Sequence, residues 1–432
     1  MRKILKQILK VLSKTVIRKY NPIVIGITGS VGKTSTKEAV FAVLKSKYSV
    51  RRSRGNLNNE FGIPLTIFGD FYEDYFDSGG FLFWLGAIFK GLRILIKKVK
   101  YPEILILELA ADKPGDIEYL VNLVKPKIGV MTAIGEMPVH VEFFSGPEHI
   151  AEEKSKLISA LPNDGFAILN FDDEIVFDMS EKSKAQIVTF GIDSRANINI
   201  SNFDFTLENQ KPLGISFKLT YNGNLVPIRL HNTLGKSQAY AAAAAAALGV
   251  ALNMNLVEIS QSLTEYQSPP GRLKLLKGIR NSLIIDDTYN SSSLSTHTAL
   301  DTVRALPAKR RIAILGDMLE LGQFSEQAHR QAGNLAGELV EYLFTVGRLS
   351  KFTYDSAFNQ LPKDNIESFN GIKEAREFIK NFIQEGDLIL VKGSQSVRME
   401  KIVEEIMAEP EKKKELLVRQ NPRWLKRKPL YP

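Results

Sequence analysis

The chain has 432 residues, of which 44% are apolar and 24% are charged, and its net charge is +9. This length is enough for two or three domains that each bury a sizeable core. The sequence contains no cysteine, which excludes disulfide bonds, thiol nucleophiles and cysteine-bound zinc. Lysines interrupt the first apolar stretch every three or four residues, so we expect no signal peptide and a cytoplasmic location.

Residues 2–19 predict a basic amphipathic helix. Ile4, Ile8, Val11 and Leu12 fall on one face at helical spacing, and lysines fill much of the remainder. Two interpretations stay open: the helix packs on the neighbouring domain, or it lies in a membrane interface. The C-terminal end of the chain is basic as well. Because no aromatic residues alternate with these charges to form a base-stacking surface, we expect no nucleic-acid partner.

Residues 23–44 predict a strand, a phosphate-binding loop and a helix. The glycines between strand and helix allow backbone N–H groups to surround one anion, and the helix N-terminus favours negative charge. Lys33 would reach the terminal phosphates, and the Thr34 hydroxyl would ligate Mg²⁺. The general spacing of such loops expects a glycine at position 27, where this chain has Ile27. The residues that we expect to contact ATP here are Gly29, Ser30, Val31, Gly32, Lys33, Thr34 and Ser35.

Strands and helices alternate from residue 23 onward, a pattern typical of a doubly wound α/β fold. The expected strands are 23–27, 104–109, 127–132, 166–170, 186–191, 282–285, 311–315, 342–346 and 388–391, with a hairpin over 197–230 and an alanine-rich helix over 239–252. The Ser-Pro-Pro-Gly string 268–271 marks a domain boundary. We predict a helical segment 1–22, a P-loop-type ATP-binding domain with a mostly parallel sheet over 23–268, a Rossmann-like α/β domain over 269–408, and a loose basic tail over 409–432.

Residues 81–96 are very apolar and are followed by three lysines before residue 101. The stretch is too short to span a bilayer, and Lys90 and Arg93 interrupt it. We therefore expect a buried helix or, together with residues 1–19, a peripheral membrane contact that extends over 81–100.

Further polar residues stand where a nucleotide site needs them. Glu108 ends a buried strand, and a carboxylate at that position is well placed to hold Mg²⁺ directly or through water. His140 and Glu142 follow the strand that ends at Thr132, and Lys154 lies on a helix expected over 148–161. In the second domain, Arg272 follows the boundary and Asp286-Asp287 follow a buried strand. Two such surfaces on two domains predict closure over ATP and a second substrate.

In this order the segments resemble the Mur ligase family, from residue 23 to residue 406. The resemblance is carried by the phosphate loop 28–38, an asparagine-rich loop 56–64, the strand end 108–117, and the strings 270–272, 286–290, 315–322 and 392–394. The family's variant of the phosphate loop accounts for the missing glycine. The strings 286–290 and 315–322 are similar to those of the branch that acts with D-alanyl-D-alanine.

The resemblance implies an ATP-dependent, ADP-forming amide ligase of peptidoglycan precursor synthesis, which joins D-alanyl-D-alanine to a muramoyl-tripeptide through an acyl phosphate. It implies that Thr34 and Glu108 hold Mg²⁺, that His140 helps to bind a second metal ion, and that Lys154 is carbamylated by CO₂ to become a metal ligand. Lys156 is the alternative assignment for that lysine. Lys33, His140 and Lys154 are the implied catalytic residues. The remaining implied contacts are Gln238, Arg272, Asp287 and Asn290 with ATP, and Asn58, Asn59 and Lys392 with the substrate.

The sequence also departs from the family pattern. Only 22 residues precede the first core strand, so the family's UDP-binding domain has no visible counterpart. A separate protein supplying that domain, a substrate held by its peptide alone, and a lipid-linked substrate are the three alternatives. Residues 235–238 read Gly-Lys-Ser-Gln where the family has Gly-x-His-Asn, and the loop before His140 is longer than usual.

Two other functions compete with this prediction. One is a related amino-acid ligase of the polyglutamate or cyanophycin type. The other is a nucleotide-binding scaffold without turnover, against which the presence of Lys33, Thr34, Glu108 and Lys154 argues. We expect the chain to act as a monomer on small-molecule substrates.

Overall fold

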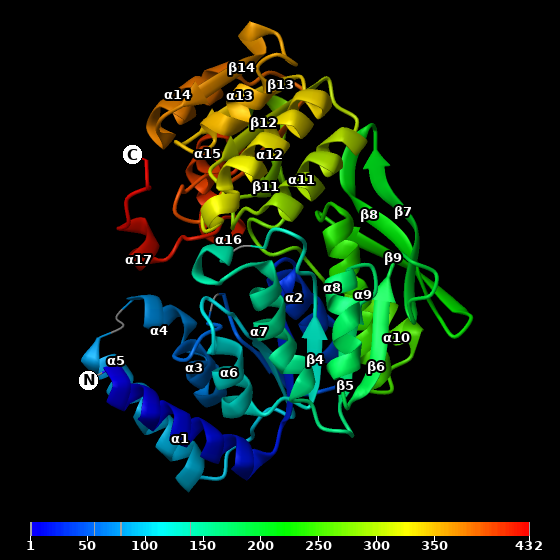
Figure 1. The fold of residues 1–432 in the computed structure, drawn as a ribbon, viewed down its shortest axis with the longest axis vertical. Helices are drawn as coiled ribbons and strands as arrows, with labels where there is room; N and C mark the ends of the chain where they lie inside the picture. Colours follow the sequence, from blue (N-terminus) through cyan, green and yellow to red (C-terminus); the bar gives the residue numbers. More distant parts are fainter. Residues whose placement is uncertain (1, 56, 78–79, 139, 432) are drawn as a thin grey trace.

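Two β-sheets organise the chain in this computed structural model, and helices cover both faces of each (Figure 1). The structure describes residues 2–55, 57–77, 80–138 and 140–431. Asn56, the first residue of the asparagine-rich loop, and Val139, which precedes His140, lie outside the described residues. The α/β fold predicted from the sequence, with a mostly parallel first sheet, is confirmed.

The first sheet has nine strands in the order β2-β3-β1-β4-β5-β6-β7-β8-β9. In this order, all neighbouring strands from β2 as far as β7 are parallel to each other. Strands β7, β8 and β9 form an antiparallel meander. The turn between β8 and β9 contains Asn222 and Gly223, both with positive φ, as the Asn-Gly signal predicts. The strands are β1 (Ile23–Thr28), β2 (Val50–Arg52), β3 (Ile104–Glu108), β4 (Ile128–Met131), β5 (Phe166–Asn170), β6 (Gln186–Gly191), β7 (Ile198–Glu208), β8 (Lys211–Tyr221) and β9 (Asn224–His231).

The central strands of this sheet are apolar throughout because helices cover both of their faces. One core contains α2, α9 and α10, and seven consecutive alanines of α9 are all buried there, which lets α9 pack closely against α2. The other core contains α1, α3, α5, α6 and α7. These helices and the short α4 and α8 are α1 (Arg2–Tyr20), α2 (Lys33–Leu44), α3 (Gly62–Phe68), α4 (Tyr72–Asp77), α5 (Phe81–Ile96), α6 (Asp116–Val124), α7 (Pro147–Ser159), α8 (Glu174–Phe177), α9 (Lys236–Ala251) and α10 (Leu256–Leu263).

The second sheet has six strands in the order β10-β11-β15-β12-β13-β14, and only β10 is antiparallel to its neighbour. Its strands are β10 (Lys274–Lys277), β11 (Leu283–Asp287), β12 (Arg310–Gly316), β13 (Tyr342–Val346), β14 (Ile366–Phe369) and β15 (Asp387–Lys392). One face packs against α11 (Ser293–Ala305), α12 (Ser325–Leu339) and α13 (Lys351–Ala357), and the other against α14 (Ile372–Phe382) and α15 (Glu400–Ile406). Residues 232–273, which include the boundary predicted at 268–271, connect the two sheets.

Residues 2–19 and 81–96, the two apolar stretches rich in basic residues, form helices α1 and α5. The first sheet with its helices is called the first unit below, and the second sheet with its helices the second unit. Helices α1 and α5 pack against each other on the first unit. Leu9, Leu12 and Val16 of α1 are buried, as are Ala87 and Ile94 of α5. The expectation that residues 81–96 form a buried helix is therefore correct for one face only, since the opposite face is exposed. No helix in the described part of the chain is long and apolar enough to cross a bilayer.

The segment from residue 409 onward is not the loose tail that its charge and prolines predict. It contains α16 (Lys413–Leu416) and α17 (Pro422–Leu425), and Leu417 is buried in the core of the second unit. Arg419 Nη2 lies 2.8 Å from Glu400 Oε2, and the Tyr431 hydroxyl donates to Asp317 Oδ2 at 2.7 Å. These apolar and charged anchors hold the segment against the second sheet's helices, and α17 reaches α4 of the first unit (Figure 1).

Candidate active site

The phosphate loop lies at the carboxyl edge of the first sheet, between the ends of β3 and β4. Gly29 has φ +142°, and a Cβ there would meet Thr132 Oγ1 at 2.0 Å, so this position requires glycine. The Thr132 hydroxyl donates to the Val31 carbonyl at 2.6 Å and fixes the loop. The buried Ser30 hydroxyl has no hydrogen-bond partner among the described residues, which suits a loop built to receive phosphate oxygens.

Glu108 is the centre of a buried polar cluster beside this loop. Its Oε2 accepts from the Thr34 hydroxyl at 3.2 Å and from Lys37 Nζ at 3.3 Å, and its Oε1 accepts from Asn58 Nδ2 at 3.2 Å. Burial raises the pKa of Glu108, but the charges of Lys37 and Lys33 outweigh it, so its pKa lies below its ordinary value. The carboxylate is therefore ionised at neutral pH.

The Thr34 and Glu108 oxygens fit Mg²⁺, which takes oxygen ligands and completes its shell with phosphate and water. Within the described residues, no three His, Cys, Asp or Glu side chains are grouped to hold a metal ion by themselves. The donor set is therefore of the kind that binds Mg²⁺ together with a nucleotide.

Lys33, which is half-buried, and Lys154, which is buried, are two lysines that face the same region. Lys33 Nζ donates to the carbonyls of Gly29 at 2.8 Å and Ser30 at 3.2 Å. Burial is the largest cause that lowers the pKa of Lys154 to about 7, and the charge of Lys33 adds to it, whereas Asp112 and Glu153 oppose it. A large fraction of the Lys154 amine is therefore neutral at pH 7.

Lys156, the alternative to Lys154, points elsewhere. Its Nζ lies 2.7 Å from Glu153 Oε2 and 3.3 Å from Glu118 Oε2, and it is partly exposed. Glu153 also accepts from the Ile117 N–H at 2.8 Å and so anchors the start of α6. The electrostatic neighbours of Lys154 include Lys33, whereas those of Lys156 belong to α6 and α7.

His140 lies between the two units. Its Nδ1 is 2.7 Å from Glu320 Oε2 of the second unit, and its Nε2 is 3.9 Å from Asp112 Oδ1 of the first. The residue adopts φ +70° at the start of a short 3₁₀ turn, a conformation that a non-glycine residue rarely takes. The structure thus places His140 beside Asp112, one of the charges that also act on Lys154 and Lys33.

Arg272 is the residue of the second unit that approaches the phosphate loop. Its charge acts on both Lys33 and Glu108, and its guanidinium stacks over the Tyr289 ring at 4.0 Å. The buried Nε of Arg272 has no hydrogen-bond partner within the described part of the chain. An unsatisfied guanidinium N–H near the loop is suited to an anionic ligand.

The other predicted residues of the second unit bind one another. Lys392 Nζ lies 2.6 Å from Asp287 Oδ2 and donates to the Asn290 carbonyl at 3.1 Å. Asp287 also accepts from the Leu273 N–H at 3.2 Å. Burial lowers the pKa of Lys392, and Asp287 partly compensates. These residues form an internal ion pair that orders the loop after β11, next to Arg272.

In two side-chain amides that we predicted to bind ligands, the amide oxygen already accepts hydrogen bonds from other residues of the protein. Gln238 Oε1 accepts from the Tyr266 hydroxyl at 2.6 Å, while its Nε2 donates to Ser268 Oγ and to the Arg272 carbonyl at 2.9 Å. Asn59 Oδ1 accepts from the N–H groups of Phe61 and Gly62 at the start of α3. Gln238 therefore fastens the boundary segment, and Asn58 is the member of the asparagine pair that reaches Glu108.

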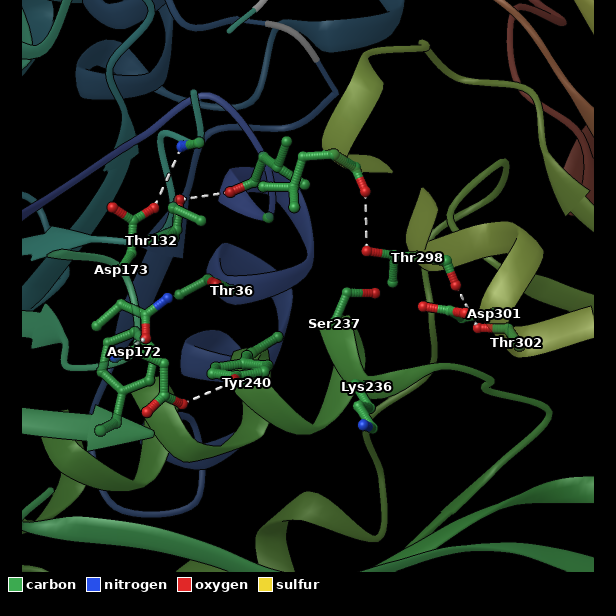
Figure 2. Close-up of a pocket in the computed structure, with 18 of the residues that line it drawn as sticks. Thr36, Thr132, Asp172, Asp173, Lys236, Ser237, Tyr240, Thr298, Asp301 and Thr302 are labelled. Atoms are coloured by element: carbon green, nitrogen blue, oxygen red, sulfur yellow. Dashed lines mark hydrogen bonds between the residues drawn. The ribbon is translucent and has the colours of Figure 1, made fainter. Parts of the chain in front are cut away.

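A cavity of about 680 Å³ opens beside the phosphate loop, between the two units (Figure 2). Val31 and Gly32, the α9 residues Lys236, Ser237 and Tyr240, and α11 residues such as Thr298 line it. Its size falls within the usual range for small-molecule sites. Tyr240 donates to Asp172 Oδ2 at 2.6 Å across one wall (Figure 2). Lys33, Glu108 and Lys154 do not line this cavity, whereas Val31 and Gly32 of the phosphate loop do. The cavity therefore adjoins the phosphate loop, and its volume has room for a nucleoside.

Sequence reasoning gave no role to three charged residues of this region, although each lies in a segment that carries the family resemblance. Lys37 lies one helical turn after Lys33, so the spacing could have placed it on the same side as Glu108. Asp112 follows Glu108 by four residues in a loop, and only the fold brings it near His140 and Lys154. Glu320 belongs to the other unit, and no local signal connects it with His140.

Comparison with protein families matches residues 27–74 and 91–249 to the Mur ligase middle domain, and residues 271–395 to the Mur ligase, glutamate ligase domain. Helix α1 and the first ten residues of α5 thus lie outside the matched ranges.

Individual relatives agree with these matches. The chain is 30% identical over 406 residues to the UDP-N-acetylmuramoyl-tripeptide–D-alanyl-D-alanine ligase of Rickettsia prowazekii, covering 88% of this chain and 77% of the relative. It is 28% identical over 404 residues to the ligase of the same name from Bacillus subtilis, covering 93% and 79%. A crystal structure of MurF from Acinetobacter baumannii superposes with a TM-score of 0.75 at 25% identity, covering 93% of this chain and 79% of that one.

Proposed function

The chain belongs to the Mur ligase family, and from this premise we propose that it joins D-alanyl-D-alanine to UDP-N-acetylmuramoyl-tripeptide with hydrolysis of ATP to ADP and phosphate. The observation that carries the proposal is the cluster of the buried Thr34, Glu108 and Lys154 with the half-buried Lys33 at the carboxyl edge of the first sheet, with Arg272 entering from the second unit. The relatives from Bacillus subtilis and Rickettsia prowazekii are both named for this reaction.

The proposed reaction has two steps. A carboxylate oxygen of the tripeptide attacks the γ-phosphorus of ATP, the bond to the β–γ bridging oxygen breaks, and ADP leaves with the electron pair. The amine nitrogen of D-alanyl-D-alanine then attacks the carbonyl carbon of the acyl phosphate. An amide bond forms, phosphate departs with its oxygen, and the nitrogen loses one proton. The electrostatic difficulty lies in the first step, because two anions must approach each other.

Lys33 and Arg272 are proposed to relieve this repulsion. Both are cations at the loop, and their effects on the pKa of Glu108 place them in one electrostatic cluster. The loop N–H groups and the start of α2 add partial positive charge at the same position. Thr34 and Glu108 would hold Mg²⁺, which when bound neutralises charge on the phosphates.

We further propose that CO₂ carbamylates Lys154. Its side chain is buried in the site and shares Asp112 with Lys33 and His140 as an electrostatic neighbour. Its neutral amine, which is abundant because its pKa is about 7, is the form that adds to CO₂. The carbamate would convert the Lys154 amine into an anionic oxygen ligand, and His140 would assist at a second metal ion. Asn58 and Asn59 are proposed to contact the peptide substrates. Lys392, whose buried Nζ is bound by Asp287 and the Asn290 carbonyl, is instead proposed to order the nucleotide site together with Asp287, Asn290 and Gln238.

The decisive experiment measures phosphate release by the purified chain with ATP, Mg²⁺ and bicarbonate. D-alanyl-D-alanine and UDP-muramoyl-tripeptide are supplied singly and together. We expect release only with both substrates, and a product whose mass exceeds the tripeptide substrate by one dipeptide less water. Release with glutamate or aspartate instead of the dipeptide would favour a polyglutamate- or cyanophycin-type ligase, and nucleotide binding without release under any condition would favour a scaffold.

Carbamylation is tested separately with ¹³C-labelled bicarbonate. We expect a carbamate carbon signal in the parent protein and in Lys156→Gln, and its loss in Lys154→Gln. A signal that persists in Lys154→Gln would overturn the assignment. We also propose that the enzyme works as a cytoplasmic monomer.

A further inference from the structure

Helices α1 and α5 lie side by side at one edge of the first unit (Figure 1). Both helices carry exposed apolar side chains. In α5, Phe81, Leu82, Phe89 and Ile96 are between 68% and 81% exposed. In α1, Ile4 and Val11 are exposed to a similar degree. These six residues, together with the less exposed Leu85 and Leu92 of α5, define the apolar face discussed below, which is larger than the scattered single apolar residues normal on a protein surface.

The α5 part of this face follows helical periodicity. Phe81, Leu85, Phe89, Leu92 and Ile96 recur at intervals of three or four residues and are all exposed. The opposite side of α5 is buried against α1 and α3. Apart from Lys90 and Arg93, α5 is apolar, and because only one side of it is covered, the exposed apolar side chains are left in need of a partner.

The charges around the face identify that partner. Residues 2–20 contain seven lysines and arginines, residues 81–100 contain five, and neither segment contains an acidic residue. Lys3, Arg93, Lys98 and Lys100 are exposed. A second copy of the chain would bring two sets of positive charges together at this face. A bilayer with anionic headgroups offers the opposite charge and an apolar layer beneath it.

Hydrogen bonds between α1 and α5 hold the two helices in a fixed arrangement, so the apolar face is preformed. Lys19 Nζ donates to the carbonyls of Ile94 and Leu95 at 3.0 and 2.8 Å, so the carboxyl ends of α1 and α5 are joined. The Tyr20 hydroxyl donates to the Ile94 carbonyl at 2.8 Å. Neither α1 nor the start of α5 belongs to the ranges that match the family, so the common ligase site does not account for this surface.

We propose that the α1–α5 face docks the enzyme on an anionic membrane surface. Both helices lie in the plane of the interface, the apolar side chains enter the boundary between headgroups and acyl chains, and the flanking lysines and arginines contact anionic headgroups. At 16 residues α5 is about 24 Å long, which suits a helix lying on the bilayer. Because the face is separate from the phosphate loop, docking does not depend on the proposed ligase reaction.

The test is flotation of the full chain with vesicles of phosphatidylcholine alone or with 30% phosphatidylglycerol. We expect the protein to float with the anionic vesicles, to remain largely unbound with the neutral ones, and to be released by high salt. The variant Phe81→Ser/Phe89→Ser/Ile96→Ser is expected to lower the bound fraction at least tenfold. The matched control Ile187→Ser/Leu225→Ser/Val257→Ser changes exposed apolar residues elsewhere and should float like the parent.

A charge variant keeps the test independent of folding defects in α5. Lys3→Glu/Arg93→Glu/Lys98→Glu leaves the apolar residues in place and should also reduce binding to anionic vesicles at least tenfold. Circular dichroism and nucleotide binding verify that each variant is folded. Absence of flotation by the parent, equal flotation by the apolar variant, or a parent dimer that the apolar variant converts to a monomer would each overturn the proposal.

Discussion

Replacing Glu108 by glutamine tests whether one carboxylate supports both stability and phosphoryl transfer. The substitution keeps the side-chain volume and one hydrogen-bond acceptor, but it removes the negative charge opposite Lys37. Lys37 is fully buried, with Nζ 3.3 Å from Glu108 Oε2, 3.8 Å from Glu38 Oε1 and 3.1 Å from the Gly55 carbonyl.

The expected loss follows from these distances. Unit charges 3.3 Å apart in an effective dielectric of about 20 attract each other by roughly 5 kcal/mol. Part of this is offset because an amide is easier to bury than a carboxylate, and Glu38 remains near Lys37, so we expect Glu108→Gln to lower the free energy of unfolding by about 2–3 kcal/mol. Adding Lys37→Met removes the unpaired cation and should restore stability to within about 1 kcal/mol of the parent.

Urea unfolding followed by circular dichroism measures the stabilities, and phosphate release measures activity. The single and the double variant should both lose at least about a hundredfold in turnover, because the ionised oxygen ligand is absent from both. Glu118→Gln, which removes an exposed carboxylate paired with Lys156, is the control and should change stability by less than about 1 kcal/mol. A double variant no more stable than Glu108→Gln would refute the reasoning, as would a single variant with the parent's turnover.

Lys33→Ala should slow phosphate release by about 10²–10³-fold, because the cation at the loop is lost, and parent-like turnover in that assay would contradict the assignment. Burial raises the pKa of Asp286 from 3.8 to about 6, so the folded state holds a proton in this range that the unfolded state has released. Stability should therefore fall as pH rises from 3.8 to about 6; Asp286→Asn should flatten this slope in thermal unfolding, and an unchanged slope would exclude Asp286 as its source. Leu417→Ala should destabilise the protein by about 2–4 kcal/mol in urea unfolding, whereas a truly loose tail would show no change.

Much of the fold could be predicted because its signals are local. The apolar runs of β1, β3 and β4 are long enough to indicate buried strands, and the Asn222-Gly223 turn specifies its hairpin. The short strands β2, β10 and β14 were missed, since charged residues interrupt their three or four positions and leave no continuous apolar run. The turn between β7 and β8 was missed as well, because Asn209 and Gln210 adopt positive φ without a glycine.

The sequence by itself determined the phosphate loop and the carboxylate that ends β3. Their chemistry resides in adjacent residues: glycines that permit the curled backbone, Lys33 and Thr34 at the start of a helix, and Glu108 at the end of an apolar run. Local backbone preferences and strand burial are sufficient to place each of them.

Only the tertiary structure decided which groups act on one another. The strand order β3-β1-β4 brings Glu108 to the loop and pairs it with Lys37, and the approach of the two units sets His140 against Glu320. The low pKa of Lys154 likewise arises from burial and from Lys33, which is distant in sequence. Electrostatic coupling depends on distance and desolvation, and the chain acquires both only when its segments pack together.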